Sequence, residues 1–396
     1  MSVLQQETPA DHSITRSPDP PMPSGVYVHL PYCRSRCGYC AFVVSTDESS
    51  AGAYREALAR ETALLARQAG GVAFDSVYLG GGTPSLTPAA DLAALLKDIR
   101  GRFDVLASSE ITLEANPEDV TPEAALDWIE AGITRVSVGV QSFEDRELSA
   151  VERRHDSARA DRALDTLGRA GLALSGDLIL GLPGQTPDSF RSSLARLCAS
   201  GVGHVSVYLL EAEKSKTIQE DRRLHPSCYL CDDAQADMWL EMGETLAREG
   251  FSHYEVSNWA LPGRQANHNV KYWKRVPTLG LGVSAHEFWN GRRRANVSSL
   301  ARYIEEMGAG RRPVAMDSPI SEDETERERI VLGLRLSEGV PAGDIENRIR
   351  RSRDAALSED YESWKRERLL LEEVPGRIRF SERGFLVSNE ILCRFV

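Results

Sequence analysis

The residues with the clearest chemical potential are three cysteines within eight positions of the chain. Cys33, Cys37 and Cys40 have the spacing C-x3-C-x2-C in the segment CRSRCGYC. Three thiolates held this closely can ligate three irons of a cubane [4Fe–4S] cluster and leave the fourth iron open to chelate a substrate. The alternatives are a structural zinc knuckle or a disulfide remnant. Zinc sites usually add a second, distant pair to C-x2-C and use four ligands, so the spacing favours a cluster.

A second C-x2-C, formed by Cys228 and Cys231, lies in HPSCYLCDDAQ without a partner pair. We expect free thiols at a helix start there rather than a metal site. The chain has seven cysteines. An odd number, with three in one tight loop, fits a reducing compartment in which thiolates stay free for metal. We therefore expect a cytoplasmic protein.

The length and net charge of the chain limit its domain organisation and the classes of partner that it can bind. The 396 residues suggest one large domain and a smaller one, and 41% hydrophobic and 27% charged residues are ordinary for a globular protein. A net charge of −12 argues against a general nucleic-acid or anionic-membrane surface. No apolar run approaches the ~18 residues of a membrane span. The first 24 residues are rich in Pro, Ser and Asp and lack a secretory pattern, so we expect a disordered tail over 1–24.

From residue 25 onward, short β-rich runs alternate with amphipathic helical stretches. This alternation predicts a parallel sheet with crossover helices. Six such units without a dinucleotide-binding fingerprint predict an α/β fold, an incomplete (β/α)6 TIM-type barrel over 25–250. The predicted strands are 25–30, 75–79, 110–115, 135–140, 174–181 and 204–210.

Polar or glycine-rich features follow the predicted strands, where barrels collect their chemistry. The cysteine loop follows the first strand and the Gly80–Pro84 turn follows the second. Glu114 lies near the end of the third strand, and Gln141 directly follows the fourth. Asp177 lies in the apolar fifth strand, where a carboxylate is costly unless it is paired. These features should therefore face one barrel mouth.

Two further regions follow. Residues 251–316 are rich in aromatics, Asn, His and Gly with little periodicity, which predicts an irregular connecting region at the substrate edge. Residues 317–396 predict helices, the first capped by Ser321 and Glu324, and a hairpin turning at Pro375–Gly376, a smaller winged-helix-like α+β domain. Residues 321–396 hold 14 Lys and Arg against 17 Asp and Glu, a net charge of −3. That balance disfavours DNA binding and favours a lid or packing role.

Residues 25–396 resemble the HemN/HemW group of radical S-adenosylmethionine (SAM) proteins. HemN enzymes are oxygen-independent coproporphyrinogen III oxidases, whereas HemW proteins look like chaperones that pass haem to apo-proteins. The C-terminal module accordingly resembles a HemN-type domain. The segments that carry the resemblance are YVHLPYCRSRCGYCAF, LGGGTPS, ITLEANPE, VSVGVQSF, GDLILGLPGQT, HVSVYLLEAE, YEVSNWA and HNVKYW.

The resemblance assigns the three cysteines to a [4Fe–4S] cluster whose open iron takes the amino and carboxylate groups of SAM. It implies that an electron donor such as flavodoxin or ferredoxin reduces the cluster. The SAM amino group would lie near Gly81, Gly82 and Thr83, where Glu114 could accept its hydrogen bond. The remaining SAM contacts that the resemblance implies are Arg153 (or its neighbour Arg154) for the carboxylate, Gln141 and Asp177 for the ribose, and Tyr27 and Tyr39.

Both aromatic assignments have structural alternatives. Tyr39 could pack on the adenine of SAM or shield the cluster from water, and the alternative is a loop aromatic without a ligand; Tyr27 could be a barrel-core residue. His268 begins HNVKYW, and histidine is a common axial ligand of haem iron. The resemblance makes this segment a candidate haem or porphyrin contact, and the alternative is a buried, hydrogen-bonded histidine.

This chain departs at two positions from the sequence patterns of HemN-type oxidases and HemW-like proteins. Oxidases of the HemN type resemble C-x3-C-x2-C-x-C, and this chain has Phe42 in place of the fourth cysteine. Many HemW-like chains have a cysteine two residues before the HN pair, where this chain has Ala266. Phe42 favours a haem chaperone that uses SAM cleavage as a control step. The alternative is a radical SAM tetrapyrrole enzyme, and for that reading the missing cysteine disfavours coproporphyrinogen III oxidation.

Overall fold

The computed structural model describes residues 22–396. The predicted disordered tail therefore lies outside the described residues except for its last three, of which Ser24 opens the first strand. Among residues 22–396, no helix combines the length and apolar composition needed to cross a membrane.

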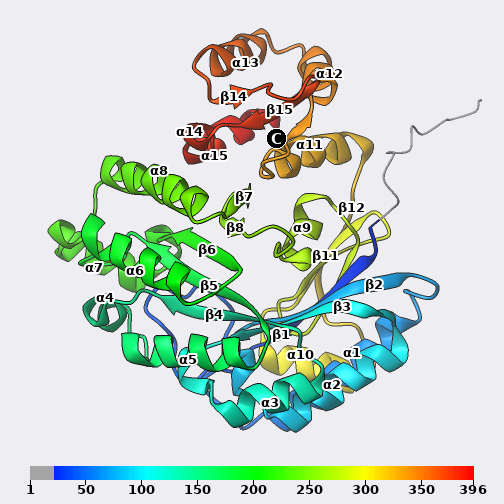
Figure 1. The fold of residues 1–396 in the computed structure, drawn as a ribbon. Coiled ribbons are helices and arrows are strands. Elements are labelled where there is room, and N and C mark those ends of the chain that lie inside the picture. Colours follow the sequence, from blue (N-terminus) through cyan, green and yellow to red (C-terminus); the bar gives the residue numbers. More distant parts are fainter. Residues whose placement is uncertain (1–21) are drawn as a thin grey trace, which may run out of the picture.

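The fold is built on a twelve-stranded sheet whose centre is parallel (Figure 1). The first six strands pair in sequence order, each parallel to the next. Their sequences are Val-, Ile- and Leu-rich, as expected for strands covered on both faces. They are β1 (Ser24–Leu30), β2 (Ala73–Gly81), β3 (Asp104–Ala115), β4 (Arg135–Gln141), β5 (Ala173–Leu180) and β6 (His204–Leu209).

Amphipathic helices connect these strands and cover the outer face of the sheet (Figure 1). Side-chain caps fix several helix starts, such as Thr121 on α3 and the capping box of Thr186 and Ser189 on α6. The helices of this region are α1 (Ala51–Ala66), α2 (Ala89–Arg102), α3 (Pro122–Ala131), α4 (Asp145–Ala150), α5 (Ser157–Arg169), α6 (Pro187–Ala199), α7 (Lys216–Leu224) and α8 (Asp232–Arg248).

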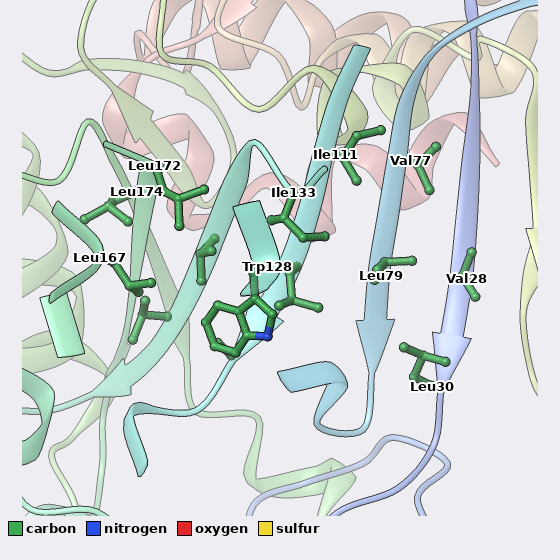
Figure 2. Packing of buried hydrophobic residues seen from close by; sticks show 14 of the residues in the cluster. Val28, Leu30, Val77, Leu79, Ile111, Trp128, Ile133, Leu167, Leu172 and Leu174 are labelled. Carbon is green, nitrogen blue, oxygen red and sulfur yellow. The ribbon is translucent and has the colours of Figure 1, made fainter. Parts of the chain in front are cut away.

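The core lies between this sheet and its outer helices. Val28, Val77, Leu79 and Ile111 are fully buried, and Trp128 of α3 lies beside them (Figure 2). Because successive side chains of a strand point to opposite faces, the residues between these apolar positions face the barrel interior. The interior set includes Tyr27, Tyr78, Glu114 and Asp177, all partly accessible rather than enclosed.

The structure corrects the prediction that 251–316 is irregular. Its chain extends the sheet at both edges: β9 pairs parallel with β1, and β8 pairs antiparallel with β6. The barrel therefore stays open and its edges carry short antiparallel strands, the last of which crosses the predicted boundary at 317. The elements are β7 (Ser252–Glu255), β8 (Asn258–Ala260), α9 (Asn267–Trp273), β9 (Thr278–Leu281), β10 (His286–Trp289), β11 (Arg292–Asn296), α10 (Leu300–Gly308) and β12 (Val314–Pro319).

The C-terminal module has its own hydrophobic cluster, centred on Ile330, Ile345 and Phe380. Its order of helix, strand, two helices and a hairpin, with sheet order β13-β15-β14, is that of a winged helix and confirms the predicted fold class. The predicted capping box of Ser321 and Glu324 opens its first helix. Its elements are α11 (Glu322–Gly333), β13 (Val340–Pro341), α12 (Ala342–Ser352), α13 (Ala355–Arg366), β14 (Leu370–Leu371), β15 (Arg377–Phe380), α14 (Glu382–Leu386) and α15 (Ser388–Leu392).

Candidate functional site

The three cysteines lie in the loop between β1 and α1, and backbone hydrogen bonds shape it. The amide of Cys33 donates to the carbonyl of Ser45 (2.9 Å), and that of Cys40 donates to the carbonyl of Cys37 (3.1 Å). Cys33 is buried, whereas Cys37 and Cys40 are partly exposed, and all three are free thiols. The loop thus presents three thiols at the carboxyl ends of the parallel strands.

The surroundings of these thiols fit an iron–sulfur cluster. The Thr83 hydroxyl donates to the Cys33 sulfur (3.2 Å) and the Arg153 guanidinium donates to the Cys37 sulfur (3.6 Å), contacts that stabilise thiolates. Burial raises the pKa of Cys33 and of Cys40, which favours the neutral thiols, and ligation to iron would offset this effect. In residues 22–396, no three His, Cys, Asp or Glu side chains are arranged so that they could hold a single metal ion. A cubane cluster does not require that convergence, because each thiolate binds a different iron.

The glycine turn after β2 holds the cysteine loop against the barrel. Gly81 has φ +108°, and a Cβ there would lie 2.5 Å from the His29 ring. A Cβ at Gly82 would lie 2.6 Å from the carbonyl carbon of Pro31. Both positions therefore require glycine because the turn packs directly on the chain that leads into the cysteine loop. Thr83, which continues the turn, contacts Cys33 as described above.

Glu114 lies at the end of β3, beside this turn. It accepts hydrogen bonds from the Tyr78 hydroxyl (2.8 Å) and from the amide of Gly81 (3.0 Å). Burial, which outweighs these two hydrogen bonds, raises the pKa of Glu114 to about 7. No Lys, Arg or His pairs with Glu114 among the described ion pairs, so its charge is not balanced by the protein.

Asp177 of β5 is a second carboxylate that forms no ion pair in the described chain. The Ser137 hydroxyl of β4 lies 3.2 Å from each of its oxygens. Burial raises the pKa of Asp177 to about 6, and hydrogen bonds from Ser206 and Ser137 and the charge of Arg153 limit the rise. Two unpaired carboxylates in one concave interior fit a ligand that brings positive charge, and the ammonium and sulfonium groups of SAM would do so.

Gln141 ends β4 in a strained conformation. Its φ of +66° is in the left-handed region that side chains other than glycine rarely adopt, and the β4–β5 register shifts between Gly139 and Gln141. Its side-chain nitrogen would lie 2.8 Å from a Cβ at Gly139, so it folds back over that glycine. Strain of this kind concentrates at functional sites.

Arg153 is oriented toward the site, whereas Arg154 is exposed. Arg153 donates to the Asn116 side-chain oxygen (2.8 Å) and to the carbonyl of Gly139 (2.7 Å). Its Nε is buried without an acceptor. Of the two adjacent arginines, Arg153 thus has the free buried donor that an anionic ligand group would satisfy.

The two tyrosines of the predicted SAM site occupy different places. Tyr27 faces the barrel interior and stacks on Tyr78, with ring centroids 6.2 Å apart. Tyr39 packs on a small apolar cluster that includes Val151 and Leu182, and its hydroxyl lies 3.5 Å from an Arg153 nitrogen. Tyr39 is therefore held beside the cysteine loop, while Tyr27 lines the interior.

His268 of α9 lies deep in the interior, at 1% exposure. Its Nδ1 lies 3.0 Å from the Ser76 hydroxyl and its Nε2 lies 2.9 Å from the Tyr272 hydroxyl. Burial lowers the pKa of His268 to about 3, which keeps the ring neutral. For His268 to coordinate haem iron, one of these hydrogen bonds would have to open. Tyr272 itself is 41% exposed.

Sequence reasoning did not select Tyr78, Asn116 or Ser137, although each holds a predicted residue in place. Strand alternation is the signal that could have identified Ser137 and Tyr78. Each lies on the same face of the sheet as a predicted site residue of its own strand or of a neighbouring strand. Asn116 follows Glu114 by two residues in TLEANPE, so the same rule places it beyond that strand end.

Comparisons with known proteins agree with this geometry. Residues 27–197 match the family model described as the radical SAM superfamily, and residues 320–387 match the HemN C-terminal domain. The heme chaperone HemW of Mycobacterium tuberculosis H37Rv is 34% identical over 360 residues, which cover 90% of this chain and 92% of that protein. HemW of Escherichia coli K12 is 30% identical over 394 residues, covering 94% and 98%.

A bovine relative, the mitochondrial radical S-adenosyl methionine domain-containing protein 1, is 34% identical over 85% of this chain and 79% of its own length. Among solved structures, the coproporphyrinogen III oxidase HemN of Escherichia coli superposes with a TM-score of 0.80. It covers 95% of this chain and 90% of the oxidase at 23% identity, which shows a shared fold.

Proposed function

This chain belongs to the radical SAM superfamily, in its HemN/HemW group, and from this premise we propose that it binds a [4Fe–4S] cluster, SAM and haem and delivers haem to apo-proteins. The observation that supports haem delivery is similarity over most of the chain to relatives named heme chaperone HemW. The observation that supports the cluster and SAM is the grouping of a three-thiol loop with two unpaired carboxylates at one barrel mouth.

Each residue of the site has a role that its contacts support. The cluster would supply the electron that cleaves SAM. Glu114, held by Tyr78 and the Gly81 amide, would accept a hydrogen bond from the SAM ammonium. The free Nε of Arg153 would donate to the SAM carboxylate. Asp177 and Gln141 would bind the ribose hydroxyls, and Tyr27 would line the same interior.

Phe42 supports the chaperone over the oxidase. It occupies the position at which HemN-type oxidases carry a fourth cysteine, and its side chain is 65% exposed. The alternative, oxygen-independent oxidation of coproporphyrinogen III or a related tetrapyrrole reaction, would have to proceed without that thiol. Similarly, haem handling in this chain does not use a cysteine at 266, where a buried alanine stands.

The haem contact that we propose is the HNVKYW segment at α9. His268 is its candidate iron ligand, and binding would require the His268–Tyr272 hydrogen bond to open. We expect His268→Ala to reduce haem affinity, measured by titration of the Soret absorbance, because the iron would lose its strongest protein bond. Tyr272→Phe is the matched control, since it removes the hydrogen bond and keeps the ring. Unchanged haem affinity in His268→Ala would place the ligand elsewhere.

The cluster assignment is tested by iron content. Anaerobic reconstitution should give about four irons per chain, and Cys37→Ala should lose them because a cubane held by two thiolates is not retained. Cys228→Ser and Cys231→Ser are matched controls, since both thiols are exposed and lie outside the cysteine loop. Full iron content in Cys37→Ala would remove the basis of the proposal.

A further inference from the structure

Hydrogen bonds connect two of the three cysteines of the loop through side chains of other elements. One terminal nitrogen of Arg153 donates to the Cys37 sulfur (3.6 Å), and the other donates to the side-chain oxygen of Asn116 (2.8 Å). The side-chain nitrogen of Asn116 donates to the Thr83 hydroxyl (3.3 Å), which donates to the Cys33 sulfur (3.2 Å). We call Arg153, Asn116 and Thr83 the thiol network.

The donor and acceptor capacity of each group fixes the direction of these bonds. A guanidinium only donates, so the Asn116 oxygen faces Arg153 and the Asn116 nitrogen faces Thr83. The Thr83 oxygen accepts from Asn116, which leaves its single hydrogen for the Cys33 sulfur. A hydroxyl that accepts a hydrogen bond is also a stronger donor, because the bonds polarise one another. Both ends of the thiol network therefore present a donor to a cysteine sulfur.

The ends of three neighbouring strands hold the thiol network in place. Thr83 lies two residues after β2, and its amide donates to the carbonyl of Tyr32 (2.9 Å). Asn116 directly follows β3. Arg153 donates to the carbonyl of Gly139 in β4 (2.7 Å). Because the fold positions these donors, their geometry does not depend on a bound cluster.

Donors on ligating sulfurs change the electron affinity of an iron–sulfur cluster. Reduction adds one negative charge, so a donor on a thiolate stabilises the reduced state more than the oxidised state. Cys33 and Thr83 are 8% and 7% exposed, and a hydrogen bond is stronger where water is excluded. Glu118 lines the small cleft beside Cys37 together with three arginines, which offset its charge. The donors should therefore raise the reduction potential.

We propose that the thiol network raises the reduction potential of a [4Fe–4S] cluster bound at the three cysteines, and that Asn116 holds its two donors in place. Asn116 forms no hydrogen bond to a cysteine in the described chain and acts through Thr83 and Arg153, so it is a positioning residue. The inference rests on the proposed function, because only a bound cluster has a potential. A purely structural role would change stability or iron content and leave the potential unchanged.

An anaerobic redox titration of the reconstituted full-length protein, without SAM, tests this effect. Dithionite gives one electron to each cluster and is oxidised toward sulfite, and electron paramagnetic resonance counts the reduced clusters. Thr83→Val keeps the side-chain shape and removes the donor to Cys33. The ratio of reduced to oxidised cluster at the wild-type midpoint should fall about tenfold, which corresponds to about 59 mV for one electron. Thr83→Ser keeps a hydroxyl and should keep the wild-type ratio.

Asn116→Asp tests the positioning role without removing the Thr83 hydroxyl. A carboxylate can still accept from Arg153, but it cannot donate to Thr83 and would take the Thr83 hydrogen away from the Cys33 sulfur. We therefore expect the ratio of reduced to oxidised cluster to fall in this variant as well. Asn116→Asp also decides the question if Thr83→Val fails to retain iron.

Thr112→Val is the matched control, because Thr112 is a threonine of β3 at 1% exposure whose hydroxyl has no hydrogen-bond partner among the described residues. It should keep the wild-type potential, and iron content would be measured in every variant. If Thr83→Val or Asn116→Asp retains its iron and titrates like wild type, or if Thr112→Val shifts the potential equally, the inference is wrong and the proposed function stands. If the wild-type protein holds no cluster, the proposed function fails and the inference fails with it.

Discussion

Glu114 and Asp177 define the chemistry of the site at the scale of single residues. Both are partly accessible carboxylates that form no ion pair in the described chain, and both accept hydrogen bonds from hydroxyl or amide donors of neighbouring strands. A protein tolerates this arrangement at low cost only when a ligand or a proton supplies the missing positive charge. With pKa values of about 7 and about 6, protons supply part of that charge near neutral pH in the ligand-free protein, and the proposed ligand SAM would supply it when bound.

We predict that SAM binding strengthens as pH rises through about 7. The pKa of Glu114 is raised to about 7, so below that pH the carboxyl is protonated and does not attract the ammonium. Glu114→Gln should weaken SAM binding by ~1.5–3 kcal/mol at high pH and flatten the pH dependence. Calorimetry from pH 6 to 8 would measure both effects. A pH profile that is identical in wild type and Glu114→Gln would contradict this role.

The same raised pKa has a consequence for the ligand-free protein. Its folded value of about 7 lies above the ordinary value of 4.5. Between those values the unfolded chain loses its proton and the folded chain keeps it, so the free energy of unfolding falls as pH rises across this window. Urea denaturation should show that loss in wild type and a smaller loss in Glu114→Gln.

At the scale of elements, the ends of the central strands determine the geometry of the candidate site. The six central strands were predictable because their apolar runs are flanked by glycine and helical repeats, and β1 and β4 end within one residue of the prediction. The edge strands were not. HEFW and RRRAN are four and five residues long, and their pairing partners are set by tertiary packing. Short polar strands carry too little periodicity to be read from sequence.

The site residues also divide into those that could be located from the sequence and those that could not. Cys33, Gly81, Glu114 and Gln141 could be located because each follows or ends a strand. The partners could not: Tyr78 and Glu114 are 36 residues apart, and Ser76 and His268 are 192 residues apart. A resemblance can point to His268, but only the fold shows that both nitrogens of its ring are engaged.

We predict that Gln141→Gly stabilises the protein and impairs SAM binding. The left-handed φ of +66° at the end of β4 costs about 1–2 kcal/mol for a residue with a side chain, and glycine removes that cost. Part of the gain is offset by the greater entropy of the unfolded glycine chain. Urea denaturation and calorimetry would be run on the same variant. Reduced stability would contradict a backbone strain at Gln141, and unchanged SAM affinity would contradict a role of its side chain in binding.

At the scale of the whole molecule, ion pairs and a backbone hydrogen bond attach the C-terminal module to the part of the chain that forms the outer strands of the sheet. Glu328 of α11 pairs with Arg275 (2.8 Å) and Arg293 (2.9 Å), and His253 of β7 lies 3.1 Å from Glu382 of α14. The amide of Val256 also donates to the carbonyl of Arg335 (2.9 Å). These contacts attach the module beside α9, where the proposed haem contact lies.

We predict that Glu328→Gln weakens the attachment of the C-terminal module to the sheet. Burial opposes ionisation of Glu328, but hydrogen bonds from Arg293 and Arg275 outweigh it and lower the pKa of Glu328. Its stabilisation is therefore present above the ordinary pKa of 4.5 and is lost as pH falls below it. Hydrogen exchange should rise in α11 of the variant at neutral pH, with a cost of about 1 kcal/mol. Exchange that matches wild type would mean that the backbone contacts alone hold the module.

The central claim, haem delivery rather than porphyrinogen oxidation, is tested most directly on one reconstituted sample. Haem binding and carbon dioxide release from coproporphyrinogen III would be measured side by side with SAM and a reductant present. Because Phe42 replaces the fourth cysteine of the oxidase pattern, we expect a Soret band from bound haem and no carbon dioxide above background. Release of carbon dioxide without haem binding would contradict the chaperone function and support the oxidase.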